Sequence, residues 1–169
     1  MASERELQTI KQLLDMAESN IQQAKSLLFA RELASKAQNL VEDDEGKIIE
    51  GIFDGEFMVG PAGKKYPVSA NYASKSKLLP GDVLKLTIAG DGTFLFKQIG
   101  PVKRKTLIGD LESAGNKFIV KCGKSKYRIS SASVSYFKAE SGDKMTILVP
   151  EEGLSEWAAV ENLLEDVSV

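Results

Sequence analysis

One pattern occurs twice in this sequence, at a constant spacing of 61 residues and without a gap. "KYPVSANYASKSKLLPGDVLKLTI", which begins at Lys65, returns as "KYRISSASVSYFKAESGDKMTILV", which begins at Lys126. The identical positions are Lys65/Lys126, Tyr66/Tyr127, Ser69/Ser130, Ser74/Ser135, Lys77/Lys138, Gly81/Gly142 and Asp82/Asp143. A chain that repeats so long a pattern is expected to form two similar units, or two halves of one pseudo-symmetric unit.

The residue pattern of each copy predicts a series of short strands. In the first copy, "IIEGIFDG", a hairpin in "EFMVGPAGKKYPV", "VLKLTI" and "TFLFKQI" read as strands, with a loop or helical turn in "SANYASKSKLLPGD". The second copy repeats this order but lacks a clear fifth strand. Five strands with a helical turn between the third and fourth are typical of a small Greek-key barrel. We therefore predict two tandem OB-like β-barrels, residues 46–105 with a linker and residues 106–150; the alternative is one pseudo-symmetric cradle-loop barrel.

Residues 1–45 predict a long coiled-coil helix. Ser3 and Glu6 form a capping-box pattern at its start. Apolar side chains then recur with alternating spacings of three and four, a set that we call the seam: Leu7, Ile10, Leu14, Ala17, Ile21, Ala24 and Leu28. Such a seam favours a partner helix, so we expect a homo-oligomer. The alternative is that the helix folds back onto its own barrel.

Residues 151–169 predict an acidic amphipathic helix. Its apolar face consists of Trp157, Val160, Leu163, Leu164 and Val167. This helix is a candidate site for a protein partner, or a cover for the basic part of the chain. The predicted fold class is thus mainly β with helical ends.

Charge is unevenly distributed along the chain. The 22 basic and 24 acidic residues give a net charge of −2. Residues 46–145 carry 17 basic and 9 acidic side chains, a net +8, whereas the segments before and after carry −4 and −6. A basic middle makes nucleic acid a candidate partner, because phosphate neutralisation needs several cations on one surface.

The candidate nucleic-acid-binding residues combine cations with neighbouring tyrosines. OB folds bind single strands by stacking bases on aromatic side chains of the sheet, next to a positively charged groove. The predicted set is Lys64, Lys65, Tyr66, Tyr72, Lys75, Lys77, Lys103, Arg104, Lys105, Lys124, Lys126, Tyr127, Arg128 and Lys138. The alternative interpretation is that the lysines only solvate the surface and that the Tyr66 and Tyr127 side chains point into the cores.

Several classes of chemistry are disfavoured. The chain has no histidine, and its one cysteine, Cys122, has no histidine to activate it. We therefore expect no enzyme, no metal site and no cofactor, and we expect Asp82 and Asp143 to make turn hydrogen bonds. The sequence has no apolar run long enough for a membrane span, no apolar N-terminal run typical of a secretory signal, and no cysteine pair. These features favour a cytoplasmic location without membrane association.

Parts of the sequence resemble three known groups of proteins. "FMVGPAGKKYPVSANYASKSKLLPGDVLKLTI" resembles the bacterial translation initiation factor one group of OB folds, with its hairpin, lysine-containing loop and "PGD" turn. The order of coiled coil and two barrels resembles the N-terminal region of actinobacterial proteasome-activating ATPases, which implies a ring-like scaffold. No GxxxxGK[ST] loop occurs, so the ATPase activity is not implied. The string "GKKYPVSANYASKSKL…GDVLKLTI…FKQIGPVKRK…SVSYFKAESGDKMTILVP…WAAVEN" also resembles an uncharacterised family of small-genome, candidate-phylum bacteria.

Two functional hypotheses result. The first is a non-enzymatic, oligomeric protein that binds single-stranded RNA or DNA in translation or transcription. The second is an oligomeric scaffold or adaptor that binds protein partners through its coiled coil and barrels.

Overall fold

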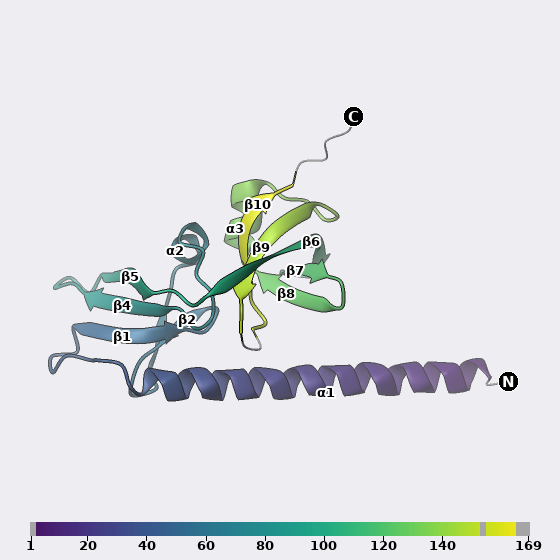
Figure 1. Cartoon of the computed structure of the whole chain (residues 1–169), viewed down its shortest axis with the longest axis horizontal. Coiled ribbons are helices and arrows are strands. Elements are labelled where there is room, and N and C mark those ends of the chain that lie inside the picture. Colours follow the sequence, from purple (N-terminus) through teal and green to yellow (C-terminus); the bar gives the residue numbers. More distant parts are fainter. Residues whose placement is uncertain (1–2, 153–154, 165–169) are drawn as a thin grey trace.

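The computed structural model describes residues 3–152 and 155–164, and Figure 1 shows a long helix below two β-rich units. Its elements are α1 (Glu4–Ala37), β1 (Ile48–Phe53), β2 (Phe57–Val59), β3 (Lys65–Pro67), α2 (Ala70–Lys75), β4 (Val83–Ile88), β5 (Phe94–Gly100), β6 (Arg104–Ala114), β7 (Lys117–Cys122), β8 (Ser125–Ile129), α3 (Ser131–Phe137), β9 (Lys144–Pro150) and β10 (Ala159–Leu163). The fold is therefore mainly β with helical parts, as the sequence predicts.

The strands form two separate five-stranded antiparallel sheets. Their orders are β3-β2-β1-β4-β5 and β10-β9-β6-β7-β8. With the second sheet reversed, the two orders are the same, and one short helix falls between the third and fourth strand of each. The repeat thus gives two sheets of one topology, which we call the first unit and the second unit.

Equivalent residues form the same helix cap and the same turn in both units. The hydroxyl oxygens of Ser69 and Ser130 cap α2 and α3 by accepting the backbone amide three residues later, as serine N-caps do. Lys77 and Lys138, just after these helices, both adopt left-handed backbone angles, with φ of 51° and 52°. Because left-handed φ is uncommon outside glycine, this shared conformation shows that the turn into the fourth strand is the same in both units.

Each unit has its own apolar core. The first core contains Ile49, Phe53, Met58, Tyr66, Leu78, Leu84 and Leu86. The second contains Leu111, Val120, Ile129, Val134, Met145, Ile147, Val149, Ala158 and Val160. The alternating residues of β4 and β9 face these cores, as the period of a half-buried strand requires.

The helix predicted over residues 151–169 is wrong for the described residues 155–164. Residues 159–163 form β10, the fifth strand of the second unit, which pairs with β9. A bulge between Val160 and Asn162 inserts Glu161 into this pairing. Because a bulge adds one residue, it changes the strand's apolar spacing from two to three, which imitates a helix. Val167 lies outside the described residues.

The apolar packing of the long helix is near its C-terminal end. Leu33 and Ala37 are buried in a cluster with Ile52 and Val59 of the first unit. All seven seam residues are exposed, and the N-terminal part of α1 extends past the second unit (Figure 1). The body contact of α1 therefore uses a different face from the seam. No helix in the described part of the chain is both long enough and apolar enough to cross a membrane.

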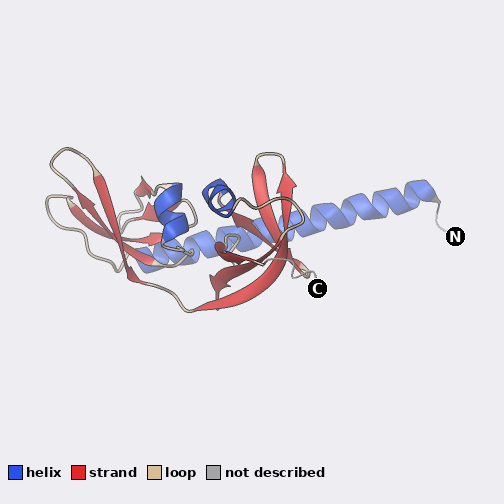
Figure 2. Ribbon diagram, turned by 90° about the horizontal axis from the view of Figure 1, so that it is seen from above, coloured by secondary structure: helices blue, strands red, loops and turns tan. Residues whose placement is uncertain are grey.

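The two units contact each other through their short helices. Figure 2 shows α2 and α3 lying side by side between the sheets, and the Ser74 and Ser133 hydroxyls are 2.9 Å apart. From the turn after α2, the Lys77 ammonium donates to the Glu161 carbonyl at 3.4 Å. These polar contacts hold the second unit beside the first.

A buried ion pair ties the connection between the units to the first unit. The Asp82 carboxylate is fully buried and lies 2.7 Å from the Arg104 guanidinium, at the start of β6. It also accepts hydrogen bonds from the Leu79 amide, the Gln98 side chain and the Val102 amide. In the second unit, the Asp143 carboxylate accepts the Glu140 amide, which matches the bond from Leu79. Both aspartates thus make the predicted turn hydrogen bond.

We expect Asp82→Ala to lower the free energy of unfolding by about 3–5 kcal/mol, because removing one partner leaves a buried charge uncompensated. The matched variant is Asp143→Ala, which removes one turn hydrogen bond and should cost about 1 kcal/mol. Urea unfolding followed by circular dichroism measures both values. Equal losses in the two variants would contradict a special role for Asp82.

Candidate nucleic-acid interface

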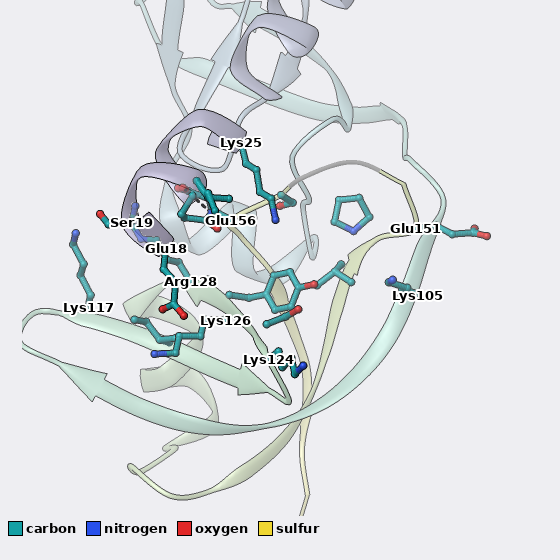
Figure 3. Close-up of a pocket in the computed structure, with 18 of the residues that line it drawn as sticks. Glu18, Ser19, Lys25, Lys105, Lys117, Lys124, Lys126, Arg128, Glu151 and Glu156 are labelled. Atoms are coloured by element: carbon teal, nitrogen blue, oxygen red, sulfur yellow. Dashed lines mark hydrogen bonds between the residues drawn. The ribbon is translucent and has the colours of Figure 1, made fainter. Parts of the chain in front are cut away.

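A groove of about 840 Å³ lies between the middle of α1 and the β7–β8 hairpin of the second unit (Figure 3). Residues 149–151 and 155–156, around the connection from β9 to β10, line its far side. Its cationic side chains are Lys25, Lys105, Lys117, Lys124, Lys126 and Arg128. We call this site the basic groove.

The basic groove also contains four carboxylates, Asp15, Glu18, Glu151 and Glu156. Figure 3 shows the Lys25 side chain extending from α1 toward the hairpin and the Glu151 side chain pointing away from it. The Glu156 carboxylate accepts hydrogen bonds from the Gln22 amide, at 3.2 Å, and from the Ser26 hydroxyl. The six cations of the groove thus outnumber its four carboxylates, and one of those four is engaged in holding α1 to the second unit.

The Glu156 contacts make α1 a wall of the groove. Gln22 and Ser26 are four residues apart and so share one face of the helix. Glu156 is held in turn by the backbone, since its carbonyl accepts the Arg128 amide at 2.7 Å. A carboxylate that accepts two side-chain donors fixes the distance between α1 and the second unit at this point.

Arg128 is held by an aromatic contact at the end of the groove. Its guanidinium lies 4.3 Å from the centroid of the Trp157 ring, within the range of a cation–π interaction. The two residues form an isolated parallel bridge between β8 and the segment before β10. The outer strands of the second sheet therefore approach each other here.

Trp157 also marks the contact between the units. A Cβ atom added at Gly55 of the first unit would lie 2.2 Å from the indole Cδ1, so only glycine leaves room for the ring. Arg128 and Trp157 line a second hollow between the units, together with Phe53 and Pro67. The guanidinium thus bridges the basic groove and the interface between units.

The basic groove is a feature of the second unit alone. At an offset of 61 residues, Lys117, Lys124, Lys126 and Arg128 correspond to Glu56, Gly63, Lys65 and Pro67. Lys65 is the one lysine among these four residues of the first unit, and its ammonium lies 3.6 Å from the Asp54 carboxylate. The same topology therefore carries a cationic surface in one unit and a nearly neutral one in the other.

The structure brings together five of the predicted site residues, Lys105, Lys124, Lys126, Tyr127 and Arg128. Lys25 and Lys117 complete the cationic lining and were missed. Lys117 follows the turn between β6 and β7 and has no equivalent lysine in the first copy, while Lys25 comes from the helix assigned to oligomerisation. Only tertiary packing places α1 against the hairpin.

The other predicted residues lie elsewhere. Lys64 and Lys75 are exposed on the first unit. Lys103 is exposed on the segment that connects the units, and Lys138 is exposed just after α3. Lys64 lies 5.3 Å from the Tyr66 ring centroid. Arg104 does not point into solvent. Its guanidinium pairs with the Asp82 carboxylate and also donates to the Lys77 carbonyl at 2.8 Å.

Two of the predicted tyrosines pack onto the first core. Tyr66 is buried, which raises the pKa of its hydroxyl, and Glu42 adds to this increase. The Tyr72 ring stacks on Phe96, with centroids 6.0 Å apart. Burial removes the Tyr66 ring from base stacking, and Phe96 takes one face of the half-buried Tyr72 ring. Tyr127 also packs against its core but lines the basic groove.

The single cysteine is not an activated nucleophile. Burial, and then the nearby Asp110 charge, raises the pKa of the Cys122 thiol, which keeps it protonated at neutral pH. No cluster of three metal-ligating side chains occurs among residues 3–152 and 155–164. The groove itself is lined by cations, carboxylates, hydroxyl groups and the Tyr127 ring.

Comparison with protein-family models and with curated proteins gives no match for this chain.

We expect Gly55→Ala to displace Trp157, because the added methyl group overlaps the indole ring. The fluorescence of this only tryptophan should shift to longer wavelength as the ring becomes more exposed. Gly63→Ala is the matched control, since Gly63 also has positive φ, at +83°, but nothing lies within 4 Å of an added Cβ. It should cost about 1 kcal/mol of stability from backbone strain, with an unchanged emission maximum. An unshifted Gly55→Ala spectrum would contradict the contact.

Proposed function

We propose that this protein binds single-stranded nucleic acid in the basic groove of its second unit. The observation that carries the proposal is the position of the cations. They cluster on the second and third strands and beside the connection between the fourth and fifth, and OB folds bind oligonucleotides at these places.

The proposal includes an OB-like barrel for each unit. Both sheets have the strand order and the helix position of a five-stranded Greek-key barrel. The parallel bridge between Arg128 and Trp157 supports closure of the second unit, since the third and fifth strands are the ones that must meet. The Tyr66 and Phe94 rings, 6.1 Å apart, cover the corresponding gap in the first unit.

The chemistry of the groove fits a flexible polyanion. Lys124 and Lys126 are exposed at the tip of the hairpin, where they can reach successive phosphates. Tyr127 and the half-buried Arg128 offer planar groups for a base. Because α1 bounds the groove on one side, a flexible single strand fits it better than a stiff duplex.

The second candidate function is an assembly scaffold. The observation in its favour is the exposed seam of α1, which offers an apolar surface for another helix. In that function the groove would bind a protein segment rather than nucleic acid.

Titration of labelled single-stranded RNA and DNA 20-mers, followed by anisotropy, tests the proposal. Six lining cations predict a loss of affinity on the order of 100-fold between about 50 and 200 mM salt, because each neutralised phosphate releases counterions. Lys124→Glu/Lys126→Glu should abolish the binding seen at the lower salt concentration.

The matched control is Lys64→Glu/Lys75→Glu, which makes the same change in net charge on the first unit, outside the groove. It should keep most of the affinity. Absence of binding at either salt concentration, or equal loss in both double variants, would reject the basic groove as the site and favour the scaffold function.

A further inference from the structure

The exposed face of α1 is strongly apolar. Its large apolar side chains are exposed by between 49% for Ile10 and 67% for Leu27. The set is Leu7, Ile10, Leu13, Leu14, Met16, Ile21, Leu27 and Leu28. A soluble monomer rarely leaves so many apolar groups in one continuous patch, so this face is expected to be covered.

A partner helix on the seam would leave the packed face of α1 in place, and Ile21 is the seam residue that also lines the basic groove. The contacts of α1 with the rest of the chain come from Gln22, Ser26, Leu33 and Ala37, which share one stripe. At about 100° per residue, the centre of the seam lies about 140° around the helix from that stripe. A second helix on the seam would therefore lie on the far side of α1 from both units.

Side-chain sizes in the seam favour an antiparallel copy of the same helix. Leu7, Leu14, Ile21 and Leu28 occupy one heptad position, whereas Ala17 and Ala24 occupy the other after Ile10. In a parallel, in-register pair each alanine would face its own copy and leave a gap between layers of leucine. In an antiparallel pair the two heptad positions face each other, so each alanine meets a leucine or isoleucine and the packing stays even.

Charges beside the seam have the same symmetry. Lys11, Glu18, Lys25 and Glu32 follow at intervals of seven residues, all exposed, with alternating sign. Reversal of one helix sets Lys11 opposite Glu32 of a second copy and Glu18 opposite Lys25, each pair occurring twice. A parallel pair would oppose these residues to Glu6, Leu13, Asn20 and Leu27, of which only Glu6 is charged. Charges at such flanking positions set the orientation of paired helices.

We propose that α1 forms an antiparallel two-stranded coiled coil with α1 of a second copy of this chain, with the two-fold axis near Gln22. The two bodies then lie at opposite ends and on opposite sides of the helix pair. Glu18 and Lys25 lie both beside the seam and in the lining of the basic groove, so each groove adjoins the dimer contact. The proposal stands independently of nucleic-acid binding.

Sedimentation equilibrium of the full chain tests the self-association. We expect a dimer, with a dissociation constant raised at least tenfold by Leu14→Asp. Gln12→Asp, an exposed change off the seam, is the matched control and should leave the dimer intact. A wild-type chain that stays monomeric, or equal effects of the two variants, overturns the proposal.

The orientation has its own tests. Lys11→Glu and Glu32→Lys should each weaken the homodimer severalfold at low salt, and an equal mixture of the two variants should dimerise more tightly than either alone. Spin labels at Gln8→Cys, in a chain with Cys122→Ser, should lie about 40 Å apart, because about 28 residues of helix at 1.5 Å each separate the two sites. A separation near about 20 Å, expected for parallel helices, or a mixture no tighter than its components, overturns the antiparallel arrangement.

Discussion

The buried pair between Asp82 and Arg104 is the constraint on which the relation between the two units depends. One carboxylate binds the turn before β4 through the Leu79 amide and the linker through the Val102 amide, each at 2.8 Å. It also binds the side chain of Gln98 on β5 and the first residue of β6. Because a desolvated charge is stable only with its partners in place, these segments must keep their arrangement together. The linker is thereby a fixed connection, and the direction in which β6 leaves the first unit is set before the second unit begins.

The two copies share the groups that turn the chain into the fourth strand and differ on the surface of the hairpin. Both copies keep the serine cap, the left-handed lysine and the aspartate of the turn, which are the groups that redirect the chain into the fourth strand. The hairpin surface, which the fold does not require to be charged, differs: the first unit has Glu56 and Pro67 where the second has Lys117 and Arg128. The proposed ligand-binding role of the second unit rests on this difference between two sheets of one topology.

Sequence reasoning reached the repeat, the strands of the first copy, the first four strands of the second copy and the capped N-terminal helix, because each depends on local patterns. It failed at β10, where the bulge at Glu161 gives a strand the apolar spacing of a helix. It also placed Arg104 in the site and missed Lys25, since one residue turns inward to Asp82 and the other enters the groove only when α1 folds against the second unit. Such errors follow from long-range contacts that no local pattern contains.

The α1 helix has to satisfy two surfaces at once. Its buried stripe is short and is reinforced at Glu156 by two side-chain hydrogen bonds, whereas its apolar seam is longer and has no partner within the described chain. Residues between these two faces, Glu18 and Lys25, would be shared between the basic groove and a helix pair. Pairing through Lys25 would remove one cation from the groove, and phosphate binding at Lys25 would remove one charge contact from the pair. The geometry of a single helix therefore implies that occupancy of the groove and pairing of α1 oppose each other at Lys25, next to Ile21, which belongs to both the seam and the groove lining.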